Sequence, residues 1–298
     1  MLNKKLFLIA NPKSGRGYIK SRLMTITDIF NRNGYLVTTY ITACRGDATK
    51  VAEKITSDYD IVVCCGGDGT LNEVITGLMQ NPKPFPLGYI PLGTLNEWST
   101  SLGISKDVKQ AAQDILNGKR LALDIGQFDD KYFVYTASFG AFTSASYSAP
   151  QEVKNAWGQA AYFFEGVKSL SQIKPISLEL CIDGETVKGD FLFGSVSNSL
   201  SMGGIIKLDK EKVKFDDGLF EVLLIENIDT LAELQEVIEA IGKRSFDKKR
   251  IHLYTGKHIS VRSALPLDWT LDGEHAVGLD ETKITNIPRA VEFIIPKK

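Results

Sequence analysis

The sequence contains no apolar run long enough to cross a bilayer. A spanning helix needs about 18 to 20 apolar residues, whereas the apolar stretch nearest the N-terminus, Leu6–Ala10, ends directly at Asn11-Pro12. That stretch is also shorter than the apolar core of a signal peptide, so it predicts a first β-strand. We therefore expect any membrane contact to be peripheral, with no transmembrane segment.

Patterns typical of disulfide frameworks, zinc sites and nucleic-acid binding are also missing. The four cysteines form no Cys-x-x-Cys pair, and the three histidines lack metal-ligand spacing. A formal net charge of −1 argues against bulk electrostatic attraction to nucleic acid, so no nucleic-acid partner is expected. No Ser-His-Asp or Cys-His arrangement favours hydrolysis. The cysteine usage fits a reducing, cytoplasmic location.

Composition and periodicity predict two domains of different fold class. The chain has 298 residues, of which 43% are hydrophobic and 24% charged, so it can bury a large core. Roughly the first 120 residues alternate apolar runs with helical patterns, which predicts a doubly wound α/β domain over 1–123. The rest shows short alternating strands, which predicts a β-sandwich over 124–289. The last strand, about 290–298, is a candidate to return to the first domain.

The expected elements follow from the same pattern. In the first domain, Asp47 is predicted to cap the second helix; the strands are Lys5–Ala10, Tyr35–Ile41, Ile61–Cys65 and Pro86–Ile90, and the helices are about 18–33, 47–56, 71–79 and 107–116. The second domain is expected to contain helices near 151–171 and 229–245 and strands at Tyr132–Ala137, Ile176–Ile182, Gly189–Val196, Leu219–Leu224, His258–Arg262 and Ala290–Ile295. Asp-Gly pairs at Asp183, Asp217 and Asp272 predict hairpin turns.

A glycine-rich loop between a buried strand and a helix is the strongest functional signal. Gly66-Gly-Asp-Gly-Thr70 follows the apolar run Ile61–Cys65. Glycines let the backbone approach a bulky anion, and the amides of Thr70, Leu71 and Asn72 at the expected helix start offer donors and a positive dipole end. The spacing matches neither the P-loop nor the GxGxxG fingerprint. The loop predicts a phosphate site of another family, although a tight turn with glycines serving geometry alone also fits it.

Two further loops follow strand ends of the same domain. They are Asn11-Pro-Lys-Ser-Gly-Arg-Gly17 and Pro91-Leu-Gly-Thr-Leu-Asn-Glu-Trp98. Ligands collect at the carboxyl ends of strands in an open parallel sheet, so the three loops are expected to line one site. Asn11, Ser14, Thr70 and Thr94 offer hydroxyl and amide groups for a phosphate or a ribose.

Taken together, these motifs resemble the diacylglycerol kinase catalytic-domain family, especially its soluble bacterial lipid kinases. The resemblance rests on three loops and two turns in the family's order: Asn11–Gly15, Gly66–Glu73, Pro91–Thr94, Asp217–Leu219 and Asp272–Glu274. Of these, only the Gly-Gly-Asp-Gly loop is shared widely, for instance with NAD kinases and phosphofructokinases. The family implies an N-terminal α/β nucleotide-binding domain, a C-terminal β-sandwich, and transfer of the γ-phosphoryl of ATP to a lipid hydroxyl.

The resemblance assigns roles residue by residue. ATP is expected against Asn11, Pro12, Lys13, Ser14, Gly15, Thr42, Gly66, Gly67, Asp68, Gly69, Thr70, Leu71, Asn72 and Thr94. Asp272 matches the family's proposed general base, and a primary alcohol is a poor nucleophile that gains from a carboxylate accepting its proton. The sequence around Asp272 alone favours a hairpin-turn residue, and the resemblance reverses that preference.

Magnesium is expected because the charge of a triphosphate must be neutralised during transfer. Asp68 and Asp124 match acids of the family's catalytic metal network. The family also suggests a structural metal held by the carbonyls of Lys214 and Leu219 and by the carboxylate of Asp217, although Asp216-Asp217-Gly218 equally fits a simple turn. Glu97 stands where many relatives have Asp, which leaves altered substrate choice or weak activity open.

The acceptor is less defined than the nucleotide side. Diacylglycerol at the membrane surface, giving phosphatidic acid for phospholipid biosynthesis, is the expectation from the family. A sphingoid base, a monoacylglycerol, NAD, or a nucleotide-binding regulator without turnover are alternatives. Aromatic residues near 132–142 and 157–164 could line an apolar cleft, although core packing explains most of them. The family further suggests a homodimer.

Overall fold

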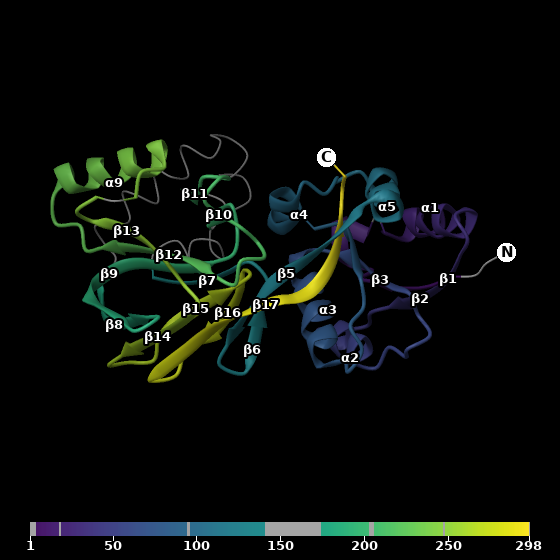
Figure 1. Cartoon of the computed structure of the whole chain (residues 1–298), viewed down its shortest axis with the longest axis horizontal. Coiled ribbons are helices and arrows are strands. Elements are labelled where there is room, and N and C mark those ends of the chain that lie inside the picture. Colours follow the sequence, from purple (N-terminus) through teal and green to yellow (C-terminus); the bar gives the residue numbers. More distant parts are fainter. Residues whose placement is uncertain are drawn as a thin grey trace. The chain divides into compact units, whose positions relative to one another are not determined.

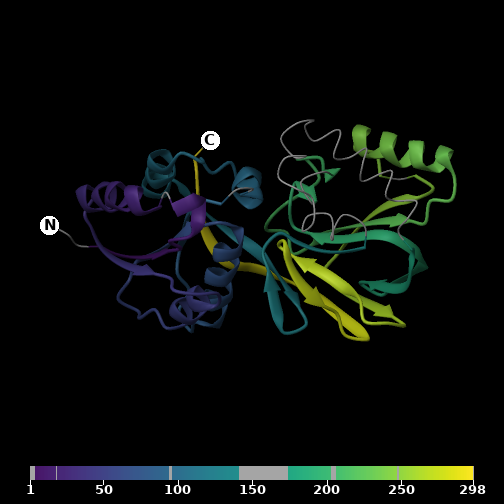
Figure 2. The same cartoon turned by 180° about the vertical axis from the view of Figure 1, so that it is seen from behind.

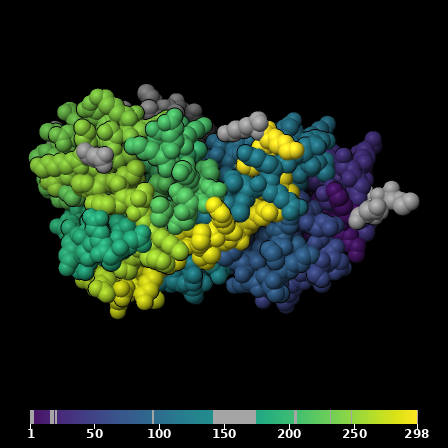
Figure 3. All heavy atoms as spheres, viewed as in Figure 1, coloured from purple at the N-terminus to yellow at the C-terminus, as the bar shows by residue number. Residues whose placement is uncertain are grey.

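The computed structural model describes residues 4–17, 19–93, 96–140, 174–202, 206–246 and 248–297. The chain divides into two compact units (Figure 1). The first comprises Met1–Ile125 and Pro288–Lys298, and the second comprises Gly126–Ile287. The chain therefore leaves the first unit once and returns along its last strand, whose yellow atoms lie among the blue atoms of that unit (Figure 3).

A parallel sheet forms the centre of the first unit. Its strands β1 (Lys4–Ala10), β2 (Tyr35–Ile41), β3 (Ile61–Gly66) and β4 (Leu87–Pro91) lie in the order β2-β1-β3-β4. The long strand β17 (Glu281–Ile295) joins β4 in parallel, and β5 (Lys119–Phe128) pairs with β17. Every residue of β3 and β4 is buried, as expected for strands covered on both faces.

Helices cover both faces of this sheet (Figure 1). On one face lie α1 (Ile19–Arg32) and α5 (Val108–Asn117), whose apolar sides share a core with alternate residues of the strands. On the other face lie α2 (Asp47–Glu53) and α3 (Asp68–Gln80), which pack against each other. Two short elements complete the unit: the 3-10 turn η1 (Ser14–Gly17) and α4 (Glu97–Leu102).

The second unit is an antiparallel β-sandwich. Its strands follow the order β16-β15-β7-β9-β8-β14-β17, with β12 paired to β9 and β13 paired to β12. The bounds are β6 (Lys131–Phe133), β7 (Thr136–Gly140), β8 (Ile176–Ile182), β9 (Glu185–Ser197), β10 (Ser201–Met202), β11 (Ile206–Lys207), β12 (Phe220–Glu226), β13 (Ile251–Gly256), β14 (His258–Ser263), β15 (Asp268–Leu271) and β16 (Glu274–Val277). The doubly wound α/β and β-sandwich classes predicted for the two halves are confirmed.

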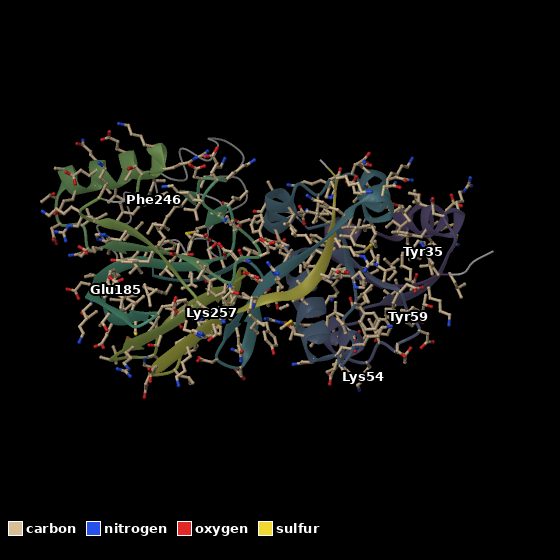
Figure 4. The ribbon with its side chains drawn as sticks, in the orientation of Figure 1. Tyr35, Lys54, Tyr59, Glu185, Phe246 and Lys257 are labelled. Carbon is tan, nitrogen blue, oxygen red and sulfur yellow. The ribbon has the colours of Figure 1, made fainter. Side chains whose placement is uncertain are left out.

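The single helix described in the second unit, α9 (Leu231–Lys243), covers the outer face of β12 and β13. It lies on the side away from β14 and β17 (Figures 1 and 2). Val237 and Ala240 pack on Leu223 and Ile225, and Phe246, just beyond the helix, fills the same core (Figure 4). In the described ranges, no helix is both long and apolar enough to span a membrane.

Four local expectations were wrong. Among the described residues, the Asp217-Gly218 turn joins no hairpin, because it precedes β12, whose partners are β9 and β13. The strand expected over Tyr132–Ala137 is broken between β6 and β7, because the amides of Val134 and Tyr135 bind a side chain instead of a neighbouring strand. The third helix begins at Asp68, three residues early. Asp47 is the first residue of α2 rather than its cap, and its carboxylate binds Tyr40 and the Ala43 amide. The helix expected at 151–171 lies outside the described residues.

Candidate functional site

The loop after β1 is joined to the glycine-rich loop through Asn11. The Asn11 backbone N–H donates to the Cys65 carbonyl at 3.0 Å, and its side-chain Nδ2 donates to Thr70 Oγ1 at 2.9 Å. The Asn11 Oδ1 accepts from the Lys13 N–H at 2.9 Å, which shapes the turn through Pro12. One polar side chain thus fixes two of the three predicted loops against each other.

The third loop meets the second at two glycines. A Cβ on Gly93 would lie 2.7 Å from the Gly67 Cα and 2.7 Å from Asn96 Oδ1, closer than side chains tolerate. The Leu92 N–H donates to the Gly66 carbonyl at 2.7 Å, and a Cβ on Gly15 would lie 2.9 Å from the Leu92 carbonyl oxygen. The glycines therefore let all three backbones approach at the carboxyl ends of the strands.

The start of α3 has the backbone geometry that anion-binding sites use. Gly67 precedes the helix without a side-chain cap, and the Leu71 N–H already donates to the Gly67 carbonyl at 3.0 Å. The amides of Asp68, Gly69 and Thr70 then have no acceptor within the helix. These three are the donors that helix geometry offers to a phosphate; of the three amides predicted from sequence, only that of Thr70 is among them. Leu71 itself is buried in the core.

Asp68 places a carboxylate beside these donors. Its Oδ2 accepts from the Glu97 N–H at 3.3 Å, and its Oδ1 is buried with no hydrogen-bond partner in the described part of the chain. Burial raises the pKa of Asp68, although the amides of Glu97, Asn96 and Trp98 and the charge of Lys106 work against it. A buried carboxylate oxygen without a hydrogen-bond partner lowers the stability of the fold. Such a group is therefore a candidate to bind a cation or a ligand.

Two further predicted residues, Thr42 and Asp124, lie at different places in the first unit. Thr42 is buried, and its N–H donates to the Ala10 carbonyl at 3.0 Å, so it stands directly after β2 at the same sheet edge. Asp124 is fully buried in β5, where its Oδ1 accepts from the Arg289 N–H at 2.7 Å. Thr94 lies outside the described residues.

Sequence reasoning missed Glu73, one turn into α3. Its carboxylate accepts from the Gly46 N–H at 2.8 Å and from the Ala48 N–H at 3.3 Å, and its carbonyl accepts from Thr49 Oγ1 at 3.0 Å. Glu73 therefore caps α2 and holds the loop that follows Thr42. The signal was present only as the acid that ends the Gly66–Glu73 motif.

In the second unit, Asp272 sits in the predicted Asp-Gly turn after β15, with φ of 49°. Its side chain is buried, and the carboxylate accepts three backbone N–H groups: Val134 at 2.6 Å, Tyr135 at 2.9 Å and Thr136 at 3.0 Å. Amide donors thus reach both oxygens and hold the carboxylate in one orientation. The residue expected to act as a base thus also organises the break between β6 and β7.

Asp183 provides an internal comparison. It occupies another Asp-Gly turn, with φ of 47°, and its carboxylate accepts from the Lys257 and His258 amides, both at 2.8 Å. Burial raises the pKa of Asp183, but the two amide hydrogen bonds, together with the charges of His258 and Lys257, outweigh burial and leave the pKa lowered. Binding neighbouring amides is therefore a property of such turns in this fold, and does not by itself indicate catalysis.

The predicted structural-metal loop precedes β12. Gly218 adopts φ of 80°, and the Leu219 N–H donates to Asp217 Oδ1 at 3.1 Å, which closes an Asx turn. Across the residues that the structure describes, no three His, Cys, Asp or Glu side chains converge as metal ligands. A cation here would therefore depend on backbone carbonyls as well as carboxylates.

Comparison with known proteins assigns the family. Residues 5–128 match the diacylglycerol kinase catalytic domain, and residues 137–295 match the YegS C-terminal NAD kinase beta sandwich-like domain. A diacylglycerol kinase of Bacillus subtilis (strain 168) is 31% identical over 99% of this chain and 97% of that relative. The chain belongs to the diacylglycerol kinase family. It is accordingly an enzyme of the phosphotransferase class, a lipid kinase by family.

Other relatives agree with this assignment. A diacylglycerol kinase of Staphylococcus haemolyticus (strain JCSC1435) is 33% identical over 97% of this chain and 88% of that protein. A solved structure of a diacylglycerol kinase from Bacillus anthracis str. Sterne superposes with a TM-score of 0.77 at 23% identity, covering 98% of this chain and 97% of that one. At that identity the structural likeness concerns the fold alone.

Proposed function

We propose that this protein is an ATP- and magnesium-dependent lipid kinase that converts diacylglycerol to phosphatidic acid. The observation that carries the proposal is the start of α3, where backbone donors, close-approaching glycines and Asn11 lie together at the carboxyl edge of a parallel sheet. Such an arrangement is suited to binding a phosphate. Membership of the diacylglycerol kinase family supports the choice of reaction.

ATP is proposed to bind along this edge. The amides of Asp68, Gly69 and Thr70 would hold phosphate oxygens, and the loop from Asn11 to Gly15 would lie over the remainder of the triphosphate. Asn11 fixes the loop through Thr70, so the phosphate donors are held in place before the nucleotide arrives. Thr42, Thr94 and the rest of the motif residues predicted above complete the proposed nucleotide site.

The residues present fit a magnesium ion near Asp68. The buried Oδ1 of Asp68 has no hydrogen-bond partner within the described residues, and a hard cation is the partner that a buried carboxylate oxygen takes up. Asp124 is proposed to extend this network. When bound, magnesium would neutralise the charge of the triphosphate as the γ-phosphoryl group moves. A second, structural cation is proposed at Lys214, Asp217 and Leu219.

Asp272 is proposed to accept the proton of the attacking hydroxyl. The acceptor oxygen forms a bond to the γ-phosphorus, the bridging bond to the β-phosphate oxygen breaks, and ADP leaves. Three backbone N–H groups hold the Asp272 carboxylate in place, so that it would be positioned to accept the proton as the bond to phosphorus forms.

A sphingoid base or a monoacylglycerol remains an alternative acceptor, and a nucleotide-binding regulator without turnover is the alternative of another class. Transfer of labelled γ-phosphate from ATP and magnesium to diacylglycerol, monoacylglycerol, ceramide and sphingosine in mixed micelles tests them together. We expect a labelled product from diacylglycerol. ATP binding without any labelled lipid would contradict the proposal. Work at a membrane surface, a cytoplasmic location and a homodimer belong to the same proposal.

A further inference from the structure

A second buried carboxylate, Glu221, has an unsatisfied oxygen. Glu221 is the second residue of β12 and is only 4% exposed. Its Oε2 is buried and has no hydrogen-bond partner among the residues that the structure describes. Glu226, at the other end of the same strand, is partly exposed and has partners: it pairs with Arg250 at 3.2 Å and with His252 at 3.1 Å.

The direction of the Glu221 side chain follows from strand alternation. Glu221, Leu223 and Ile225 share one face of β12, because side chains alternate along a strand. Leu223 and Ile225 belong to one hydrophobic cluster with Val213, and Phe215 packs against that cluster. The segment that leads into the Asx turn therefore contributes to the layer on the face into which Glu221 points. Asn198 Nδ2 donates to the Phe215 carbonyl at 3.5 Å and helps to hold this segment in place.

We propose that Glu221 is a side-chain ligand of a divalent cation held by the Lys214–Leu219 loop. The inference rests on the structural cation site proposed above and adds a buried carboxylate to it. Calcium and magnesium take oxygen ligands from carboxylates and backbone carbonyls, which is the donor set that Asp217, Glu221 and the loop supply. The cation would supply the missing partner of Glu221 Oε2 and join β12 to the segment that covers it.

Thermal unfolding of the full chain, without nucleotide or lipid, tests this site. Chelator-treated protein is titrated with calcium, and separately with magnesium, while Tm is recorded. We expect Tm to rise saturably for the wild type. In Glu221→Gln the apparent cation affinity should fall about 10- to 100-fold or more, on the scale of lost metal-site support. Glu226→Gln, a matched change on the same strand, should keep the wild-type affinity.

The order of stabilities gives a second readout. In chelator, Glu221→Gln should be about as stable as the wild type, because burial raises the pKa of Glu221 and favours the neutral acid, which the amide resembles in size and charge. In saturating cation, the wild type should be the more stable. Equal cation-dependent shifts in both proteins would overturn the role of Glu221, and no shift in the wild type would overturn the cation site itself. Should Glu221→Gln not fold, Glu221→Asp, which keeps the charge but shortens its reach, must show weakened cation affinity. The lipid-kinase assay decides the proposed reaction separately.

Discussion

The carboxylate of Asp68 accepts a hydrogen bond from the backbone N–H of Glu97 at 3.3 Å. The first residue of α3 is thereby joined to the first residue of α4. The contact brings Asp68 of the Gly-Gly-Asp-Gly loop next to Glu97, the position at which many relatives have Asp. The extra methylene of Glu97 therefore changes the reach of a side chain whose backbone is fixed by Asp68.

Asp68→Asn should separate stability from catalysis. The amide oxygen of Asn can still accept from the Glu97 N–H, and the buried charge is gone, so Tm should stay within the equivalent of about 1 kcal/mol or rise. Turnover should fall roughly 10²- to 10³-fold, the usual cost of losing an electrostatic group of an active site. Chemical denaturation and the phosphotransfer assay measure the two effects. Unchanged turnover would remove Asp68 from the mechanism.

Asp272→Asn tests the proposed base. An Asn side chain cannot accept three backbone N–H groups in the same way, so unfolding should cost about 1 to 3 kcal/mol less than in the wild type. If Asp272 accepts the proton, kcat should fall roughly 10²- to 10⁴-fold while ATP still binds. Steady-state kinetics and nucleotide binding by calorimetry provide the readouts.

Asp183→Asn is the matched control for that experiment. Asp183 lies in an Asp-Gly turn of the same kind and accepts two backbone amides. Its replacement should lower stability by a similar amount and leave kcat unchanged. A comparable loss of activity in both variants would mean that the Asp272 effect comes from folding alone.

Gly93→Ala should weaken ATP binding, because the added Cβ would clash with the backbone of Gly67. The added Cβ would lie 2.7 Å from the Gly67 Cα, so the loop after β4 must move away from the glycine-rich loop. Overpacking of this kind costs about 1 to 3 kcal/mol, and ATP affinity should fall with it. Gly242→Ala in α9 meets no atom within 4 Å and should leave ATP affinity unchanged. Nucleotide titration of both variants tests the difference.

Glu73→Gln should raise the KM for ATP more than it lowers kcat. An amide group in place of Oε1 or Oε2 faces the N–H of Gly46 or Ala48, which loosens the loop after Thr42. Glu53→Gln, on the neighbouring helix, is the control. A fall in kcat with KM unchanged would argue that Glu73 acts in another way.

Glu233, which belongs to the capping box of α9, should make the free energy of unfolding depend on pH in the acid range. The hydrogen bond from Arg250 to Glu233, at 2.7 Å, and the amides of Asp229 and Thr230 lower the pKa of Glu233 from 4.5 to about 2. Because the pKa is lowered on folding, this stabilisation is complete above about pH 4.5 and is lost as the pH falls toward 2. The Tm difference between wild type and Glu233→Gln should therefore shrink between pH 5 and about pH 3. A gap that does not change with pH would contradict the assignment.

Hydrophobic periodicity was sufficient to predict the fold class. The strands Tyr35–Ile41 and Ile176–Ile182 were predicted to the residue, because apolar runs and turn residues mark both ends. The break after β6 could not be predicted, since it depends on Asp272, more than a hundred residues away in the chain. Local pattern carries no information on a side chain that replaces a strand partner.

The candidate site divides in the same way. The glycine loops were visible in sequence because a close backbone approach demands glycine, as at Gly67 and Gly93. Glu73 and Glu221 were not, because an acid in a helix or a strand is ordinary until its surroundings are known. Only the tertiary structure shows that Glu73 lies at the start of α2 and that Glu221 lies on a covered face of the sheet.

The strand β17 has a consequence for synthesis on the ribosome. β4 pairs with β3 on one edge and with β17 through Phe293 on the other, so the parallel sheet lacks a strand until residues near 295 have been made. The second unit, Gly126–Ile287, is complete in sequence before that point. We therefore expect the second unit to complete its fold first during translation. Until the last strand has been synthesised, the sheet of the first unit keeps an unpaired edge at β4.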